Sequence, residues 1–113
     1  HGFDIEILPT NPPQLLASWF VFAPTSGQAW IGGLGPIDGN QAVVQGYQVA
    51  GPGALFPPDF NGAKVQRQLW GTLTFTFTDC NTGQLSWAST VPAYGSGTLN
   101  LVRLTMPAGL TCP

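Results

Sequence analysis

Alternation of apolar and polar residues is clearest between Leu69 and Trp87. The turn-forming segment DCNTG interrupts it, and QLSW then begins a second strand. Alternation with a period of two is typical of a β-strand with one buried face. The stretch therefore predicts a β-hairpin. Its inward residues are expected to be Gly71, Leu73, Phe75, Phe77, Leu85 and Trp87, and its outward stripe Trp70, Thr72, Thr74, Thr76 and Thr78.

Further strands are expected at residues 3–8, 15–23, 28–36, 41–50 and 97–105, separated by turns rich in Gly, Pro, Asn and Asp. Residues 15–23 are apolar on both faces, which indicates that a core covers one face and something else the other. Together with the hairpin, these strands predict a single all-β domain over residues 1–113. About seven short antiparallel strands would follow one another as a meander, closed as a small barrel or folded as a sandwich.

The segment from Gly51 to Gly62 contains too much Pro and Gly for a strand and is predicted to be a loop. It nevertheless carries Leu55, Phe56 and Phe60. Apolar residues in a long loop usually mean that the loop folds back over an edge of the core, and less often that it forms a binding surface.

The two cysteines, Cys80 and Cys112, are predicted to form a disulfide that ties the C-terminal tail to the tip of the hairpin. A structural disulfide places the chain in an oxidising compartment, so we expect a secreted or cell-surface protein. A first residue other than Met fits either a processed secreted chain or a fragment.

Charge is scarce, since Asp, Glu, Lys and Arg make up 7% of the residues and the net charge is −2. Weak repulsion between copies indicates an extracellular chain that either associates with something or tolerates doing so. Three basic residues cannot neutralise a nucleic-acid backbone, and no apolar run is long enough to span a membrane. The expected partners are therefore further copies or another extracellular protein.

Candidate catalytic chemistry is sparse. His1 is the single histidine, whereas a histidine-brace copper site needs a second one; an N-terminal-His copper protein remains a remote alternative. Asp4 and Glu6 would lie about 7 Å apart on one strand face, a spacing that permits glycoside hydrolysis. They are interpreted instead as the solvated face of an edge strand. No catalytic residue, metal or cofactor is predicted, and the chain is not expected to be an enzyme.

Tryptophans offer a second hypothesis, a carbohydrate-binding module. Flat indole rings stack on sugar rings while neighbouring hydroxyls supply hydrogen bonds. The candidate residues are Trp70, Thr72, Thr74 and Thr76 of the outward stripe, with Trp19 and Trp30. Tryptophans also fill the cores of small β domains, and that structural role is the preferred interpretation.

Four segments, HGFDIEIL, LLASWFVFAPTSGQAWIGG, FPPDFNGAKV and WGTLTFTFTDCNTGQLSW, span nearly the whole chain. Together they resemble a Trp-rich β domain that occurs alone, in tandem or attached to other domains in secreted proteins of proteobacteria. The matching positions are Gly2, Trp19, Phe20, Gly27, Trp30, Phe60, Val65, Gly71 and Phe75. The resemblance implies a β fold and secretion by a bacterium. It implies no catalytic residue, because the family has no established activity.

One departure from that family concerns the first strand. In the family a short strand carrying G-x-W-x-N-P normally precedes the segment that matches residues 3–8, and this sequence begins without it. The first strand, with Phe3, Ile5 and Ile7 inward, is then expected to be an open edge or a slot for a strand from another molecule. The sequence thus favours a structural or interaction module that self-assembles, for instance into a filament or surface layer.

Overall fold

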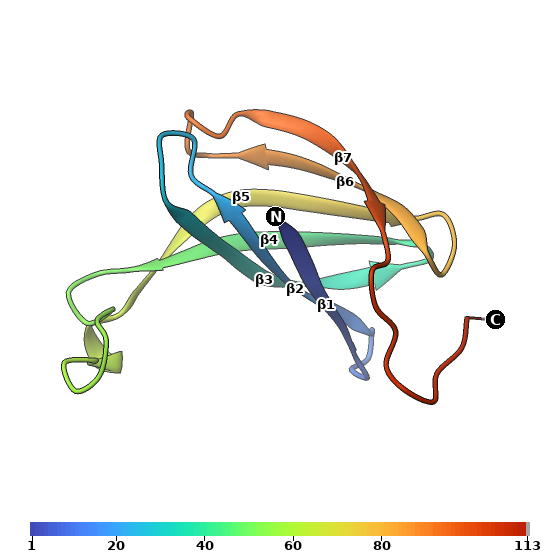
Figure 1. Ribbon diagram of the computed structural model, residues 1–113, viewed down its shortest axis with the longest axis horizontal. Helices are drawn as coiled ribbons and strands as arrows, with labels where there is room; N and C mark the ends of the chain where they lie inside the picture. Colours follow the sequence, from blue (N-terminus) through green and yellow to red (C-terminus); the bar gives the residue numbers. More distant parts are fainter. Residues whose placement is uncertain (113) are drawn as a thin grey trace.

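The computed structural model describes residues 1–112, which form seven β-strands and one short 3-10 helix. The elements are β1 (Gly2–Leu8), β2 (Gln14–Phe22), β3 (Gln28–Asp38), β4 (Gln41–Ala50), η1 (Gly62–Lys64), β5 (Gln66–Phe77), β6 (Thr82–Ser89) and β7 (Ser96–Val102). The strands pair antiparallel in sequence order and form one sheet, curled into a half-barrel (Figure 1). The predicted all-β antiparallel meander is confirmed. No helix within residues 1–112 has the length and apolarity of a membrane span.

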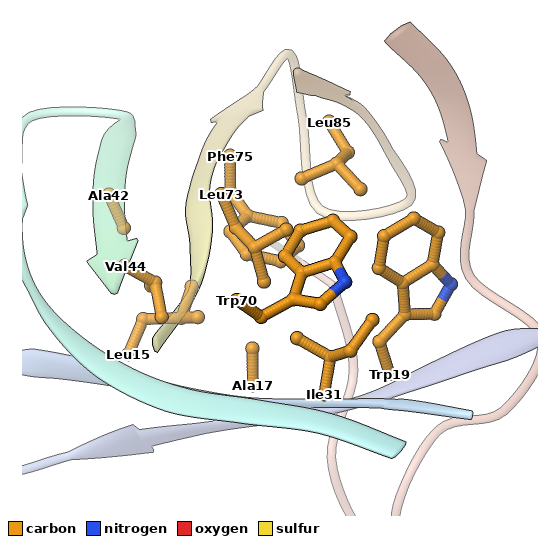
Figure 2. Close-up of a cluster of buried hydrophobic side chains, with 10 residues drawn as sticks. All are labelled: Leu15, Ala17, Trp19, Ile31, Ala42, Val44, Trp70, Leu73, Phe75 and Leu85. Carbon is orange, nitrogen blue, oxygen red and sulfur yellow. The ribbon is translucent and has the colours of Figure 1, made fainter. Parts of the chain in front are cut away.

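The core lies on the inner face of the curl, where alternate residues of successive strands meet. Ten side chains form it: Leu15, Ala17, Trp19, Ile31, Ala42, Val44, Trp70, Leu73, Phe75 and Leu85 (Figure 2). Of the predicted inward residues of the hairpin, Leu73, Phe75 and Leu85 are fully buried, and Phe77 and Trp87 pack against the cluster.

The sheet bends where the backbones of β3 and β4 approach most closely. Pairing between these strands is interrupted between Gly32↔Tyr47 and Ile37↔Ala42. A Cβ at Gly33 or Gly35 would overlap a carbonyl oxygen of β4, so only glycine allows the approach. As a result β1–β3 cross over β4–β7 (Figure 1), and the two parts of the inner face enclose the core.

Trp70 lies in the core, so the prediction that it faces outward with the threonines is wrong. On β4 the residue pairs run Gly46↔Gly71 and then Tyr47↔Leu69, which leaves Trp70 without a partner in the register. This bulge breaks the two-residue period, because Trp70 and Gly71 are consecutive and both buried. Gly71 permits it, since a Cβ there would overlap the Ala88 carbonyl oxygen of β6.

The loop between β4 and β5 projects away from the sheet (Figure 1). Leu55, Phe56 and Phe60 are 55%, 89% and 58% exposed. The prediction that this loop folds back over an edge of the core is therefore wrong. The physical reason is that β4 and β5 remain paired as far as Ala50↔Gln66, which carries the loop beyond the core.

The predicted disulfide between Cys80 and Cys112 is present. The tail after β7 contains no strand up to residue 112, and Arg103 fixes its start. The Arg103 backbone N–H donates to the Asn81 carbonyl at 2.8 Å, and its Nε donates to the Cys80 carbonyl at 2.8 Å. The tail is thus held against the β5–β6 turn, as predicted.

Candidate functional site: two open edges and the outer face

Among residues 1–112 the sheet has two open edges, because β1 pairs only with β2 and β7 pairs only with β6. An edge strand presents unpaired backbone N–H and C=O groups that can accept another strand. The structure therefore places the predicted edge residues Phe3, Ile5 and Ile7 on a strand with one free side.

Side chains on the inner face of β1 are only partly covered. Phe3 stacks on Trp19, with ring centroids 4.9 Å apart, and Ile5 also packs against the core. Ile7 is 58% exposed. On the opposite face of the strand, Asp4 and Glu6 are exposed. The apolar inner face of the sheet thus extends to the β1 edge, where its side chains are only partly covered.

The β7 edge has a similar alternation with a different outer face. Leu99 and Leu101 point inward and are half-buried against the core. The exposed residues that alternate with them, Thr98, Asn100 and Val102, carry no charge. One edge of the sheet is therefore acidic on its outer face, and the other is neutral.

His1 lies against the core rather than in a cluster of ligands. Its Nδ1 accepts a hydrogen bond from Trp19 Nε1 at 3.3 Å. Within residues 1–112 no group of three or more His, Cys, Asp or Glu side chains is placed to hold a metal ion. Trp19 itself is 5% exposed, and this burial leaves no open ring face for a ligand.

The tryptophans predicted as a binding set are separated by the sheet. Trp70 and Trp19 pack edge to face in the core, with ring centroids 5.9 Å apart (Figure 2). Trp70 is 1% exposed, and its Nε1 has no hydrogen-bond partner among residues 1–112. Trp30 is 67% exposed on the outer face of β3. Of the three, Trp30 alone presents its ring to solvent.

Trp30 borders an open hollow on the outer face of β2, β3 and β4. We call this the outer hollow; its outward-facing lining residues are Leu16, Ser18, Phe20, Trp30, Gly32, Leu34, Gln45, Tyr47, Val49 and Arg67. Phe20 meets the Trp30 ring edge to face at 6.0 Å between centroids. Arg67 reaches over from β5, with its guanidinium carbon 4.4 Å from the centroid of Tyr47.

The threonines lie on the outer face, as predicted, next to the outer hollow. Gln41 Nε2 donates to Thr76 Oγ1 at 3.2 Å, and Gln45 Nε2 donates to Thr72 Oγ1 at 3.5 Å. Cross-strand pairing extends this face over β6 and β7. It forms an uncharged and mainly polar array: Gln41, Val43, Gln45, Thr72, Thr74, Thr76, Gln84, Ser86, Ala88, Ser96, Thr98 and Asn100.

Asp79 is a charged group with a structural task in the β5–β6 turn. Its carboxylate accepts the Asn81 N–H at 2.7 Å and the Thr82 hydroxyl at 2.9 Å. These hydrogen bonds lower the pKa of Asp79 below its ordinary value, because they stabilise the ionised form. The carboxylate therefore holds the β5–β6 turn.

The sequence analysis missed Phe20, Tyr47 and Arg67 as members of a common surface. The sequence did contain an indication for Phe20. The strand β2 is apolar on both faces, which indicates that its outer face is also covered by a contact. Comparison with protein-family models, with curated proteins and with solved structures finds no match to this chain. The geometry of the edges and of the outer face is therefore the basis for assigning a function.

Proposed function

We propose that this chain is a secreted, non-catalytic interaction module that associates with copies of itself through the open edges of its sheet. One observation carries the proposal: the apolar inner face reaches both edges, and its last side chains remain half-buried or exposed. A strand added at such an edge gains backbone hydrogen bonds and covers apolar surface. The disulfide supports an oxidising location.

Charge selects which edges meet. If two β1 strands paired antiparallel about Ile5, Asp4 of each copy would face Glu6 of the other on the outer face. Like charges directly opposite destabilise a strand pair. When β1 meets β7 of a second copy, Asp4 and Glu6 face the uncharged residues Thr98 and Asn100 instead. The pairing of β1 with β7 is therefore favoured over the pairing of β1 with β1.

The inner faces of these two edges also match. Phe3, Ile5 and Ile7 on β1 would continue into Leu99 and Leu101 on β7, which adds apolar area to the core surface. Because the two edges differ, the contact is head to tail, and each added copy leaves one edge of each kind free. Such a contact builds rings or filaments rather than closed dimers.

The experiment is a mass measurement over a wide concentration range, by light scattering or sedimentation. We expect the average mass to rise with concentration, and to stay at the monomer value in Ile5→Lys, since a charge on the inner face of an edge strand blocks pairing. Ala54→Lys adds the same charge in the exposed β4–β5 loop and is the matched control. A monomeric wild-type chain at the highest concentrations would refute the proposal.

A carbohydrate-binding module is the second candidate function, and the exposure of Trp30 favours it. Its residue set differs from the predicted one. Trp19 and Trp70 are in the core, whereas Thr72, Thr74 and Thr76 stay on the outer face and adjoin the outer hollow.

A further inference from the structure

We infer that the outer hollow binds an acidic polysaccharide, with a sugar ring on Trp30 and a carboxylate on Arg67. The inference is independent of strand addition, because it concerns the outer face of β2–β4 and not an edge. Three features carry it: an exposed aromatic ring in a held orientation, an open floor beside it, and one cation without an acidic neighbour in the lining.

Trp30 provides the stacking surface. Its ring is 67% exposed, and the edge-to-face contact with Phe20 restrains the ring while most of its surface stays exposed. Gly32 follows Trp30 on the same face of β3 and lacks a side chain, which leaves room above the strand. The C–H face of a pyranose packs well on an exposed indole.

The positive charge of Arg67 favours a ligand with a negative charge. The guanidinium lies over the Tyr47 ring, a cation–π contact that holds its position and leaves its N–H groups free to donate sideways. The lining residues of the outer hollow include this cation and no carboxylate. Guanidinium groups pair with carboxylates through two parallel hydrogen bonds, so charge complementarity favours a uronic acid over a neutral sugar.

The shape and the surroundings favour a polymer over a free sugar. The hollow is open to the surface, with a volume of about 640 Å³, within the range of roughly 300–1,000 Å³ that ligand sites occupy. Gln45 lines the hollow and also donates to Thr72, which connects it to the uncharged polar array of β4–β7. A chain with one residue on Trp30 would continue over hydroxyl and amide groups.

The test is titration of the Ile5→Lys chain with soluble polygalacturonate, followed by tryptophan fluorescence and calorimetry. The Ile5→Lys substitution blocks strand addition, so self-association does not contribute to the binding signal. A failure to bind polygalacturonate is therefore distinguishable from a failure to self-associate. We expect saturable binding that weakens as salt increases, and at least tenfold weaker binding in Trp30→Ala and in Arg67→Gln. Phe56→Ala removes an aromatic ring that is 89% exposed in the β4–β5 loop, and it should bind normally.

Three outcomes would overturn the inference. The first is no binding of polygalacturonate. The second is binding without the expected specificity, seen as equal binding of a neutral dextran or as unchanged binding by Trp30→Ala. The third is a loss of self-association in Trp30→Ala made in the otherwise wild-type chain, which would assign the outer hollow to a second copy of the protein.

Discussion

The middle of the inner face and its two margins carry the same alternating pattern but differ in burial. In the middle, Leu73 and Phe75 are fully buried between neighbouring strands. At the margins, Ile5 on β1 and Leu99 on β7 are only half-buried, and Ile7 is 58% exposed. Each margin strand has one hydrogen-bonded neighbour, whereas each middle strand has two.

The difference shows that the pattern of a strand decides which side chains face inward, whereas the number of neighbouring strands decides how fully they are buried. A sheet that closes on itself buries all of its inward residues. This sheet stays open, so its apolar face is larger than one copy covers. The middle therefore stabilises the fold, and the margins remain partly exposed, where we propose that a second copy binds.

The largest effect is expected in the middle. Trp70→Ala removes a buried indole that packs against Trp19 and Tyr94, and we expect a loss of about 3–5 kcal/mol in the free energy of unfolding, measured with urea. Trp70→Phe should cost less, because it keeps a ring and removes an N–H that has no partner among residues 1–112. A loss below about 0.5 kcal/mol, typical of surface substitutions, would contradict the assignment of Trp70 to the core.

A matched pair of truncations sharpens the comparison. Leu73→Ala in the middle should cost about 2–5 kcal/mol, since it leaves a cavity in a fully buried site. Ile7→Ala at the margin should cost less than about 1 kcal/mol, because the side chain is mostly solvated in the single copy, and should weaken self-association. Equal losses from denaturant unfolding of dilute, monomeric protein would show that the margin is already covered within one copy.

A smaller effect is expected from charge on the outer face of β7. Thr98→Lys would bring a cation beside Asp4 and Glu6 of a second copy, and Thr98→Glu would bring an anion. Cross-strand charge pairs contribute about 0.2–1 kcal/mol, so the dissociation constant should fall by up to about fivefold for Lys and rise by a similar factor for Glu. Sedimentation measures both, and identical constants would argue against the pairing of β1 with β7.

The smallest effect concerns the turn that joins β5 to β6. Asp79 has a folded pKa below its ordinary value of 3.8, with the hydrogen bond from the Asn81 N–H as the largest cause and that from the Thr82 hydroxyl next. Its contribution is complete above the unfolded pKa and disappears as pH falls through the folded one. Asp79→Ala should therefore melt slightly below wild type at pH 7, with the gap closing in acid. A gap that persists below both pKa values would mean that Asp79 acts sterically.

The strands were accessible from the sequence because each depends on local pattern, and the disulfide was accessible because the sequence has two cysteines. The five inward residues from Leu73 to Trp87 in the hairpin follow directly from alternation. Trp70 was misplaced because its inward turn depends on a bulge against Gly46 of β4, and pairing between strands is not encoded in one strand's period. The outer hollow was missed for a related reason, since Phe20, Tyr47 and Arg67 come from three different strands.

The most direct measurement of the central claim mixes two blocked chains. Ile5→Lys blocks the β1 edge and Leu101→Lys blocks the β7 edge, and circular dichroism with thermal melting checks that each variant is folded. Each variant alone has one edge that can still pair, and it should remain a monomer at concentrations where the wild-type chain forms larger assemblies. Mixed in equal amounts, the two should form a complex of one copy each and nothing larger, as measured by light scattering. A mixture of two folded variants that stays monomeric would contradict head-to-tail pairing of β1 with β7.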